Sequence, residues 1–280
     1  MSKEFKFNTI MVHSGVFHAD DVFCVAMAQY INPEIEVIRV PRISMDEIPD
    51  TTIVCDIGGG RYDHHQPDAE IAEDGHKYAA CGLLFRDFWE YIFPNEKSAD
   101  SFKTKYIVPI ELQDNGVETN PLSMLVRSYN PSWNSTITES EAFDSAVEVV
   151  FQLIVNEVNL VKSALMAESV VKEAFNTATD KRIIVLDKFV PYKSIISADT
   201  TYKDMEFVIH PSNRGGYALN TIPDTSVECN GGFNPPRVAL SRDWLGENKP
   251  LGLTFCHPAL FIASFDTMEH AVDAALSLLG

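Results

Sequence analysis

The pattern of hydrophobic and polar positions changes along this chain from alternating strands and helices to one long helix, and then to strands with short turns. The first part predicts strands over 8–13, 35–40 and 51–56, helices over 20–31 and 77–93, and a helical segment around Pro109 over 102–116. Strands that alternate with helices are typical of parallel sheets. We therefore predict an α/β first domain with a doubly wound, mainly parallel sheet.

The second part begins after a turn-rich stretch at 128–138. Residues 139–178 contain no glycine or proline, which predicts one long helix or a pair of helices. Strands are then expected over 182–187, 205–210, 216–222 and 253–265, and an amphipathic helix over 267–280. This pattern favours a smaller α+β domain. We expect three parts: a catalytic domain over 1–130, a helical connector over 139–178 and a substrate-binding domain over 179–280.

Composition narrows the class of protein. The chain of 280 residues is 45% hydrophobic, enough to bury a core, and no uninterrupted apolar run approaches the ~18–20 residues of a membrane helix. We see no secretory signal at its start. The five cysteines are scattered and odd in number, which favours free, buried thiols in a reducing cytosol; they are Cys24, Cys55, Cys81, Cys229 and Cys256. We therefore expect a cytoplasmic protein without a membrane partner.

Histidines and carboxylates gather in two short stretches, HSGVFHADD at 13–21 and DHHQ at 63–66. Several of these residues lie at or just beyond predicted strand ends, and the carboxyl ends of parallel strands meet at one sheet edge. The residues expected there are His13, His18, Asp20, Asp56, Asp63, His64 and His65. Nitrogen and oxygen ligands without thiolates suit Mn, Fe, Co, Zn or Mg, and their number exceeds the need of one ion. Asp21 is expected to cap the following helix rather than bind metal.

The order of these stretches along the chain is similar to a known series of motifs. H-x-x-x-x-H-x-D-D, D-I-G-G, D-H-H-Q and Q-D-N-G (113–116) together resemble the motif series of the DHH phosphoesterase superfamily, which includes RecJ-type exonucleases and family II inorganic pyrophosphatases. The first motif, and YAACGLLFRDF at 78–88, are most similar to the melanocyte-proliferating-gene (Myg) family of DHH hydrolases. His18 stands where the wider superfamily has aspartate, a change that favours ions that prefer imidazole.

The resemblance implies a division of roles among the candidate residues. One metal ion would be held by His13, His18 and Asp56, and the other by Asp20, Asp56, His64 and Asp114. The shared Asp56 would bridge the ions, His65 would face the scissile phosphate, and Asp63 would orient a histidine. From the residues alone, Asp114 also fits a turn before Asn115-Gly116. We expect two divalent ions, Mn²⁺ first, with Mg²⁺, Co²⁺, Fe²⁺ or Zn²⁺ as alternatives.

The implied activity is metal-dependent phosphoester hydrolysis by a two-metal-activated hydroxide, in a centre between the two domains. The family resemblance points to a 3′–5′ exonuclease on RNA or short oligonucleotides. The net charge of −18 repels nucleic acid at long range and favours a small phosphorylated substrate instead. A phosphatase or pyrophosphatase, a non-catalytic metal-binding scaffold and a metal-dependent amide hydrolase remain alternatives, as does a homodimer. Besides His65, the candidate substrate contacts are Lys77, Arg214, Arg237 and His257, each equally compatible with a surface role.

Overall fold

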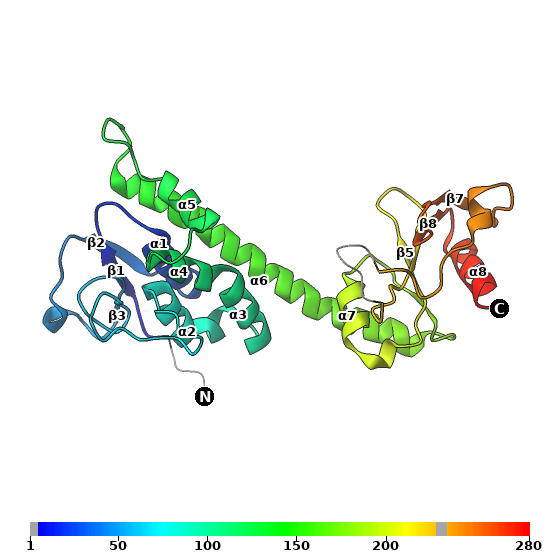
Figure 1. Ribbon diagram of the computed structural model, residues 1–280, viewed down its shortest axis with the longest axis horizontal. Coiled ribbons are helices and arrows are strands. Elements are labelled where there is room, and N and C mark those ends of the chain that lie inside the picture. Colours follow the sequence, from blue (N-terminus) through cyan, green and yellow to red (C-terminus); the bar gives the residue numbers. More distant parts are fainter. Residues whose placement is uncertain (1–4, 228–233) are drawn as a thin grey trace. The chain divides into compact units, whose positions relative to one another are not determined.

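The computed structural model describes residues 5–227 and 234–280. The chain divides into two compact units, Met1–Lys162 and Ser163–Gly280, each described here by itself (Figure 1). The division falls inside the long helix for which the sequence predicted a separate connector.

A three-stranded parallel sheet forms the centre of the first unit. Its strands are β1 (Thr9–His13), β2 (Glu36–Val40) and β3 (Thr52–Val54), in the order β2-β1-β3. The predicted parallel sheet is thus confirmed. Helix α1 (Ala19–Ile31) connects β1 to β2, whereas the connection from β2 to β3 carries only the 3-10 turn Met45–Glu47. A doubly wound sheet would have a helix there, so the sheet is smaller and simpler than predicted.

Helices cover this sheet and build most of the core of the first unit (Figure 1). After α1 come α2 (Ala80–Ile92), α3 (Glu96–Phe102), α4 (Val108–Asp114), α5 (Pro121–Ser128) and the first part of α6 (Glu139–Thr177). A π-helical segment, Lys103–Ile107, joins α3 to α4 just before Pro109, whose ring has no N–H to donate within a helix. The sequence predicted neither α3 nor α5.

The strand order explains where a site forms in this unit. β1 is central, and the chain leaves it toward β2 on one side and returns to β3 on the other. In open α/β sheets this reversal of strand order opens a crevice at the carboxyl ends of the strands. His13 is the last residue of β1, and Asp56 follows β3 after Cys55. The fold therefore brings the two predicted clusters to the same edge.

Helix α6 is one continuous helix, not a pair. Its first part supplies Phe143, Val150 and Ile154 to the core of the first unit, and its last part supplies Ala167 and Val171 to a core of the second. The helix includes a stretch of mean hydropathy 1.4, so by length and composition it could cross a membrane. The sequence did not predict a membrane helix here, because charged residues interrupt the apolar run. Core helices of water-soluble proteins pass the same test.

The second unit contains a five-stranded mixed sheet in the order β4-β5-β6-β8-β7, which agrees with the predicted α+β class. The strands are β4 (Ile183–Val185), β5 (Phe207–Pro211), β6 (Tyr217–Thr221), β7 (Leu253–Cys256) and β8 (Ile262–Phe265), and the helices are α7 (Tyr192–Ala198) and α8 (Met268–Leu279). β4 and β5 pair in parallel, and the other neighbouring strands of this sheet pair antiparallel. The single strand predicted over 253–265 is wrong: a turn at His257–Leu260, where Leu260 has a φ of 57°, separates β7 from β8.

The cysteines that the structure describes are free. Cys24, Cys55 and Cys81 are buried in the first unit, as expected, and Cys256 is half-buried in the second. Cys229 lies outside the described residues.

Candidate metal centre

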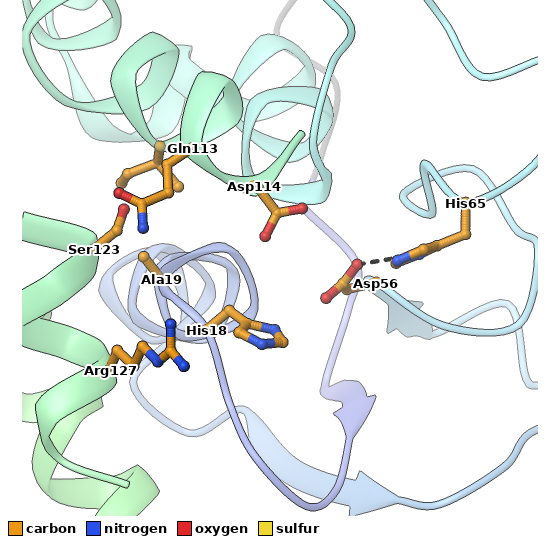
Figure 2. A pocket seen from close by; sticks show the side chains of 9 residues that line it. His18, Ala19, Asp56, His65, Gln113, Asp114, Ser123 and Arg127 are labelled. Atoms are coloured by element: carbon orange, nitrogen blue, oxygen red, sulfur yellow. Dashed lines mark ion pairs between the residues drawn. The ribbon is translucent and has the colours of Figure 1, made fainter. Parts of the chain in front are cut away.

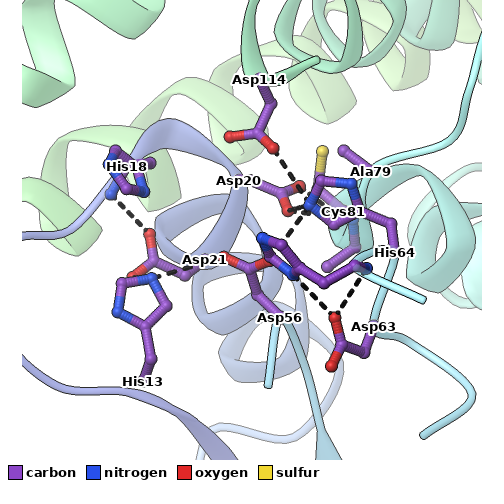
Figure 3. Close-up of polar contacts among 12 residues, drawn as sticks. His13, His18, Asp20, Asp21, Asp56, Asp63, His64, Ala79, Cys81 and Asp114 are labelled. Atoms are coloured by element: carbon purple, nitrogen blue, oxygen red, sulfur yellow. Dashed lines mark hydrogen bonds and ion pairs between the residues drawn. The ribbon is translucent and has the colours of Figure 1, made fainter. Parts of the chain in front are cut away.

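Imidazole and carboxylate atoms from five segments meet at the carboxyl ends of β1 and β3 (Figure 3). Three groups of ligand atoms lie close enough to hold an ion, with all atoms of each group within 4.8 Å of one another. The groups are His13, His18 and Asp56; Asp56, His64 and His65; and Asp20, His64 and Asp114. The structure thus gathers every metal ligand named from the sequence.

Asp56 occupies the centre of this cluster. Its Oδ2 lies 3.3 Å from His13 Nε2, and its Oδ1 lies 3.2 Å from His64 Nε2. Burial raises the pKa of Asp56, but His13 and His64 outweigh burial and lower the pKa to about 2. Its φ of 60° is left-handed, a conformation that a non-glycine residue adopts at a cost and that aspartate tolerates better than most. The main-chain N–H donates to Tyr62 O at 2.9 Å, which holds this turn in place.

The glycines after Asp56 serve the turn itself. Gly58 has a φ of +87°, and a Cβ there would lie 2.6 Å from the side chain of Ile43. Gly59 has a φ of +72°, and its N–H donates to Asp63 Oδ2 at 2.7 Å. These residues therefore return the chain from Asp56 to the DHHQ stretch.

Asp20 is fully buried and links two helices. Its carboxylate accepts hydrogen bonds from the N–H groups of Ala80 at 2.9 Å and Cys81 at 2.7 Å, at the amino terminus of α2. Free N–H groups and the helix dipole both favour a negative charge at this point. Burial nevertheless raises the pKa of Asp20 well above its usual range, and the charges of Asp56 and Asp114 act in the same direction. A cation at the cluster would relieve this repulsion.

His64 and Asp114 complete the inner part of the cluster. His64 Nε2 lies 3.0 Å from Asp114 Oδ2, at the end of α4, and 3.8 Å from Asp20 Oδ2. Burial lowers the pKa of His64, but the carboxylates of Asp114 and Asp56 outweigh it and raise the pKa to about 10. Within the described residues, both ring nitrogens and Asp56 Oδ1 are buried without a well-aligned hydrogen-bond partner.

These unpaired atoms fit a metal site. Buried polar atoms in native structures almost always have a partner, and a metal ion would satisfy several of them at once. The donor set of nitrogen and oxygen atoms suits borderline and hard divalent ions. The residues present therefore agree with the metal centre that the sequence predicted.

The beginning of α1 corrects one expectation. His18, not an aspartate, is the N-cap residue, and Asp21 lies inside the first turn. Asp21 Oδ1 accepts the N–H of His18 at 2.9 Å, so this carboxylate does tie down the helix start. Its Oδ2 lies 3.3 Å from His13 Nε2, and hydrogen bonding of His13 with Asp56, together with the charge of Asp21, raises the pKa of His13 to about 9. Asp21 therefore also supports a candidate ligand, which the capping interpretation missed.

His65 points differently from its neighbour His64. Its side chain is 65% exposed, and its Nδ1 lies 2.8 Å from Asp63 Oδ1 and 3.5 Å from Asp56 Oδ1. Asp63 is buried and also accepts the N–H groups of Gly59 and His65. The predicted arrangement, with Asp63 orienting a histidine, agrees with these contacts. Because His65 Nδ1 is near Asp56, it is a candidate ligand as well as a candidate substrate contact.

An open cavity of about 310 Å³ adjoins the cluster (Figure 2). Asp56, Asp114, His18 and His65 line one part of it, and Ala19, Ile110, Gln113, Ser123 and Arg127 line the rest. The sequence named Gln113 only as the first residue of the Q-D-N-G stretch, and it assigned no role to Ser123 and Arg127, because no element was predicted for their segment. Only their position on α4 and α5 relates them to the cluster.

Other segments hold the cluster in place. Asn130, in the turn-rich stretch after α5, accepts the N–H of Phe17 at 3.0 Å and donates to its carbonyl at 2.9 Å, which anchors the first motif. Glu111 is fully buried on α4, accepts the N–H of Ala79 at 3.3 Å and contacts His76 Nε2 at 2.9 Å. No pattern in the sequence indicates these contacts, which join residues distant along the chain.

The remaining predicted substrate contacts do not line this cavity. Lys77 is half-buried before α2, and its carbonyl accepts Asn115 Nδ2 at 3.0 Å. Arg214 and His257 lie in turns of the second unit. Arg237 donates to the carbonyls of Tyr202, Lys203 and Met205, at 3.3, 2.7 and 3.2 Å. These bonds give Arg237 a structural role, because they connect it to other residues of the second unit.

The parallel sheet and the cluster at its carboxyl edge define an α/β protein with a candidate histidine–aspartate metal centre. Residues 9–279 match the model of the MYG1_exonuc family, described as an uncharacterised protein family (UPF0160). The chain belongs to this family, in agreement with the resemblance of its motifs.

Curated relatives extend over nearly the whole chain. The MYG1 protein of Schizosaccharomyces pombe is 24% identical and covers 96% of this chain and 97% of its own length. The MYG1 protein of Saccharomyces cerevisiae is 26% identical, with coverage of 95% and 94%, and that of Dictyostelium discoideum is 25% identical, with coverage of 97% and 96%. No solved structure matches the chain significantly.

Proposed function

We propose that the protein is a metal-dependent phosphoester hydrolase that acts as a 3′–5′ exonuclease on RNA or short oligonucleotides. The observation that carries this proposal is the set of three ligand groups at the carboxyl ends of β1 and β3, next to an open cavity. The name of the family model, MYG1_exonuc, supports an exonuclease-type activity.

We assign the ligands to two ions as the motif resemblance implies. His13, His18 and Asp56 would hold one ion, and Asp20, Asp56, His64 and Asp114 would hold the other, with Mn²⁺ as the first candidate. Divalent ions at these groups would lower the pKa of bound water and so supply a hydroxide near neutral pH. The backbone N–H groups of Ala80 and Cys81 fix Asp20, and Tyr62 fixes the turn at Asp56. The protein thus holds the ligand atoms rigidly before substrate arrives.

His65 is the candidate group for contact with the substrate. It lines the cavity, and Asp63 fixes its ring through Nδ1, which leaves Nε2 as the nitrogen available to a phosphoryl oxygen. A protonated imidazole would donate a hydrogen bond there and offset negative charge that develops on phosphorus oxygens. We therefore assign His65 to the substrate rather than to a metal, with Asp63 as its positioning residue.

Size and charge bear on the substrate. A cavity of about 310 Å³ lies at the lower end of small-ligand sites, which suits one terminal nucleotide or a small phosphoester. The net charge of −18 disfavours the binding of long nucleic acids, because the protein repels phosphates along their whole length. These two observations favour short oligonucleotides, and they keep a small-molecule phosphatase or pyrophosphatase as the second candidate.

A substrate panel tests the proposal. Purified protein with Mn²⁺ is incubated with short RNA, short DNA, cyclic dinucleotides and pyrophosphate, and Asp56→Asn serves as the inactive control. A 3′–5′ exonuclease shortens 5′-labelled RNA stepwise and releases a mononucleotide first from 3′-labelled RNA. Turnover of pyrophosphate alone would favour the second candidate. No turnover of any of these compounds would leave the non-catalytic scaffold as the better account.

A further inference from the structure

We propose that Gln113, Ser123 and Arg127 form a phosphate-binding subsite opposite the candidate metal cluster. This inference rests on the proposed function, because it assigns the part of the cavity that holds an anionic group of the substrate. The three residues line the same cavity as Asp56, Asp114 and His65 (Figure 2).

Ser123 provides the first observation. It is only 6% exposed and lines the cavity, and its hydroxyl oxygen is buried without a hydrogen-bond partner among the described residues. A buried hydroxyl without a partner destabilises a fold, so such groups are rare unless a ligand or water satisfies them. The hydroxyl is therefore available to an oxygen of a bound ligand.

Helix α5 places Arg127 beside this serine. The two residues are four apart on one helix, so their side chains lie on the same face. The helix begins at Pro121, after Asn120, whose side chain accepts the N–H of Leu122 at 2.9 Å. This cap fixes where the helix starts and hence which face meets the cavity.

Gln113 adds a donor of known orientation. Its side-chain oxygen accepts the main-chain N–H of Asn120, so its amide NH₂ is the group left for the cavity. Figure 2 shows this nitrogen directed toward the space between Ser123 and Ala19. The wall made by α4 and α5 can therefore donate hydrogen bonds through an amide, a hydroxyl and a guanidinium.

Arg127 gives the subsite its charge. Within the described parts of the chain, its guanidinium makes no ion pair, although Asp56 and Asp114 line the same cavity. An arginine that only balanced the acidic cluster would be expected to pair with one of them. The guanidinium fork matches the oxygens of phosphate, and the other two donors complete a site for a tetrahedral anion.

The division of the cavity fits a phosphorylated substrate. Acceptor atoms on one side of the cavity would hold cations, and donors on the other side would hold phosphoryl oxygens. The phosphate group would then lie between the cations and the donors. A phosphate group of the substrate is the ligand that this arrangement recognises, whether it belongs to an oligonucleotide or to a small phosphoester.

Calorimetric titration with inorganic phosphate tests the subsite on the full chain. We expect Arg127→Ala to weaken phosphate binding about tenfold to a hundredfold, because a hydrogen-bonded charge is lost, and Arg127→Lys to restore part of the affinity. Arg42→Ala removes the same charge at an exposed position that does not line the cavity, and it should leave affinity unchanged. Thermal unfolding and metal content of all variants should match the wild type.

Ser123→Ala separates a binding role from a structural one. Removal of a hydroxyl without a protein partner should not destabilise the fold, but it should weaken phosphate binding about fivefold. Wild-type protein that binds no phosphate, or equal affinity in wild type, Arg127→Ala and Ser123→Ala, would overturn the subsite.

The outcome is independent of whether the enzyme hydrolyses the substrates in the panel. Binding that depends on Arg127 without turnover supports the subsite and contradicts the hydrolase. Turnover with an unchanged KM in Arg127→Ala supports the hydrolase and contradicts the subsite.

Discussion

At the scale of single residues, the fold holds imidazoles and carboxylates of the site close together, and their charges shift one another's pKa values. His13 and His64 face Asp56 from two sides, with pKa values raised to about 9 and about 10. Asp21 lies behind His13, and burial raises its pKa to about 7. Metal ions bind neutral imidazoles and ionised carboxylates, so protons and metal ions compete for these atoms.

The pH dependence of stability follows from these pKa values. A histidine whose pKa is higher in the folded state stabilises the fold fully below its unfolded pKa of about 6.5. That contribution is lost as the pH rises through the folded values of about 9 and about 10. We therefore expect metal-free protein to lose thermal stability between neutral pH and about pH 10. His64→Gln, which cannot carry the charge, should lose less over the same interval.

Metal ions should reverse this trend. Because binding displaces protons, the gain in melting temperature from added Mn²⁺ should grow as the pH rises. Calorimetry or fluorescence-monitored unfolding, with and without a chelator, measures both effects. Equal pH profiles for metal-free and metal-loaded protein would contradict competition between protons and metal at this cluster.

Asp63 offers a second prediction at this scale. Asp63→Asn keeps the shape of the side chain but removes the charge that holds His65 Nδ1. Loss of such a supporting contact typically lowers activity about tenfold to a hundredfold. We expect a lower kcat with unchanged metal content, measured on the best substrate of the panel. Asp68→Asn, at an exposed position of the same segment, is the control and should have no effect.

At the scale of elements, helix termini position the cluster. The amino terminus of α2 receives Asp20 from α1 and Glu111 from α4, through the N–H groups of Ala79, Ala80 and Cys81. Gly82 lets α4 approach this point, since a Cβ there would lie 1.7 Å from Glu111 Oε1. The packing of α2 against α4 and the geometry of the candidate site are therefore linked.

Gly82→Ala tests this link. The added methyl group must displace Glu111 or shift the helix, and overpacking of this kind costs about 1–3 kcal/mol. We expect a lower melting temperature together with weaker metal binding, because the donors to Asp20 move with α2. Glu90→Ala, on an exposed position of the same helix, should change neither quantity appreciably. A destabilised variant with wild-type metal affinity would show that α2 does not position Asp20.

Local pattern predicted most elements but not all. β1, α1, β2 and α2 were predicted because each is an apolar or alternating stretch between turn signals. Helix α5 was missed because Asn120-Pro121 marks a turn as well as a helix start, and eight residues show little period. The segment 253–265 was predicted as one strand rather than two, because its apolar composition continues through the turn at Pro258.

At the scale of the whole molecule, the order of motifs was more informative than composition. The spacing of HSGVFHADD, DHHQ and QDNG predicted a cluster that the structure assembles from two helices, two strand ends and the loop that carries DHHQ. Arg127, Ser123 and Asn130 could not be predicted, because their relation to the cluster depends on the packing of α5 rather than on local pattern. The net charge of −18 then limits which phosphorylated substrates can approach.

The most direct test of the central claim is the number and position of metal ions. Crystals of the protein grown with Mn²⁺ should give two anomalous difference peaks per chain on either side of Asp56. One peak should lie beside His13 and His18, and the other beside His64 and Asp114. Asp56→Ala should lose this density together with its bound metal in solution. A map without a peak at this cluster would contradict the account.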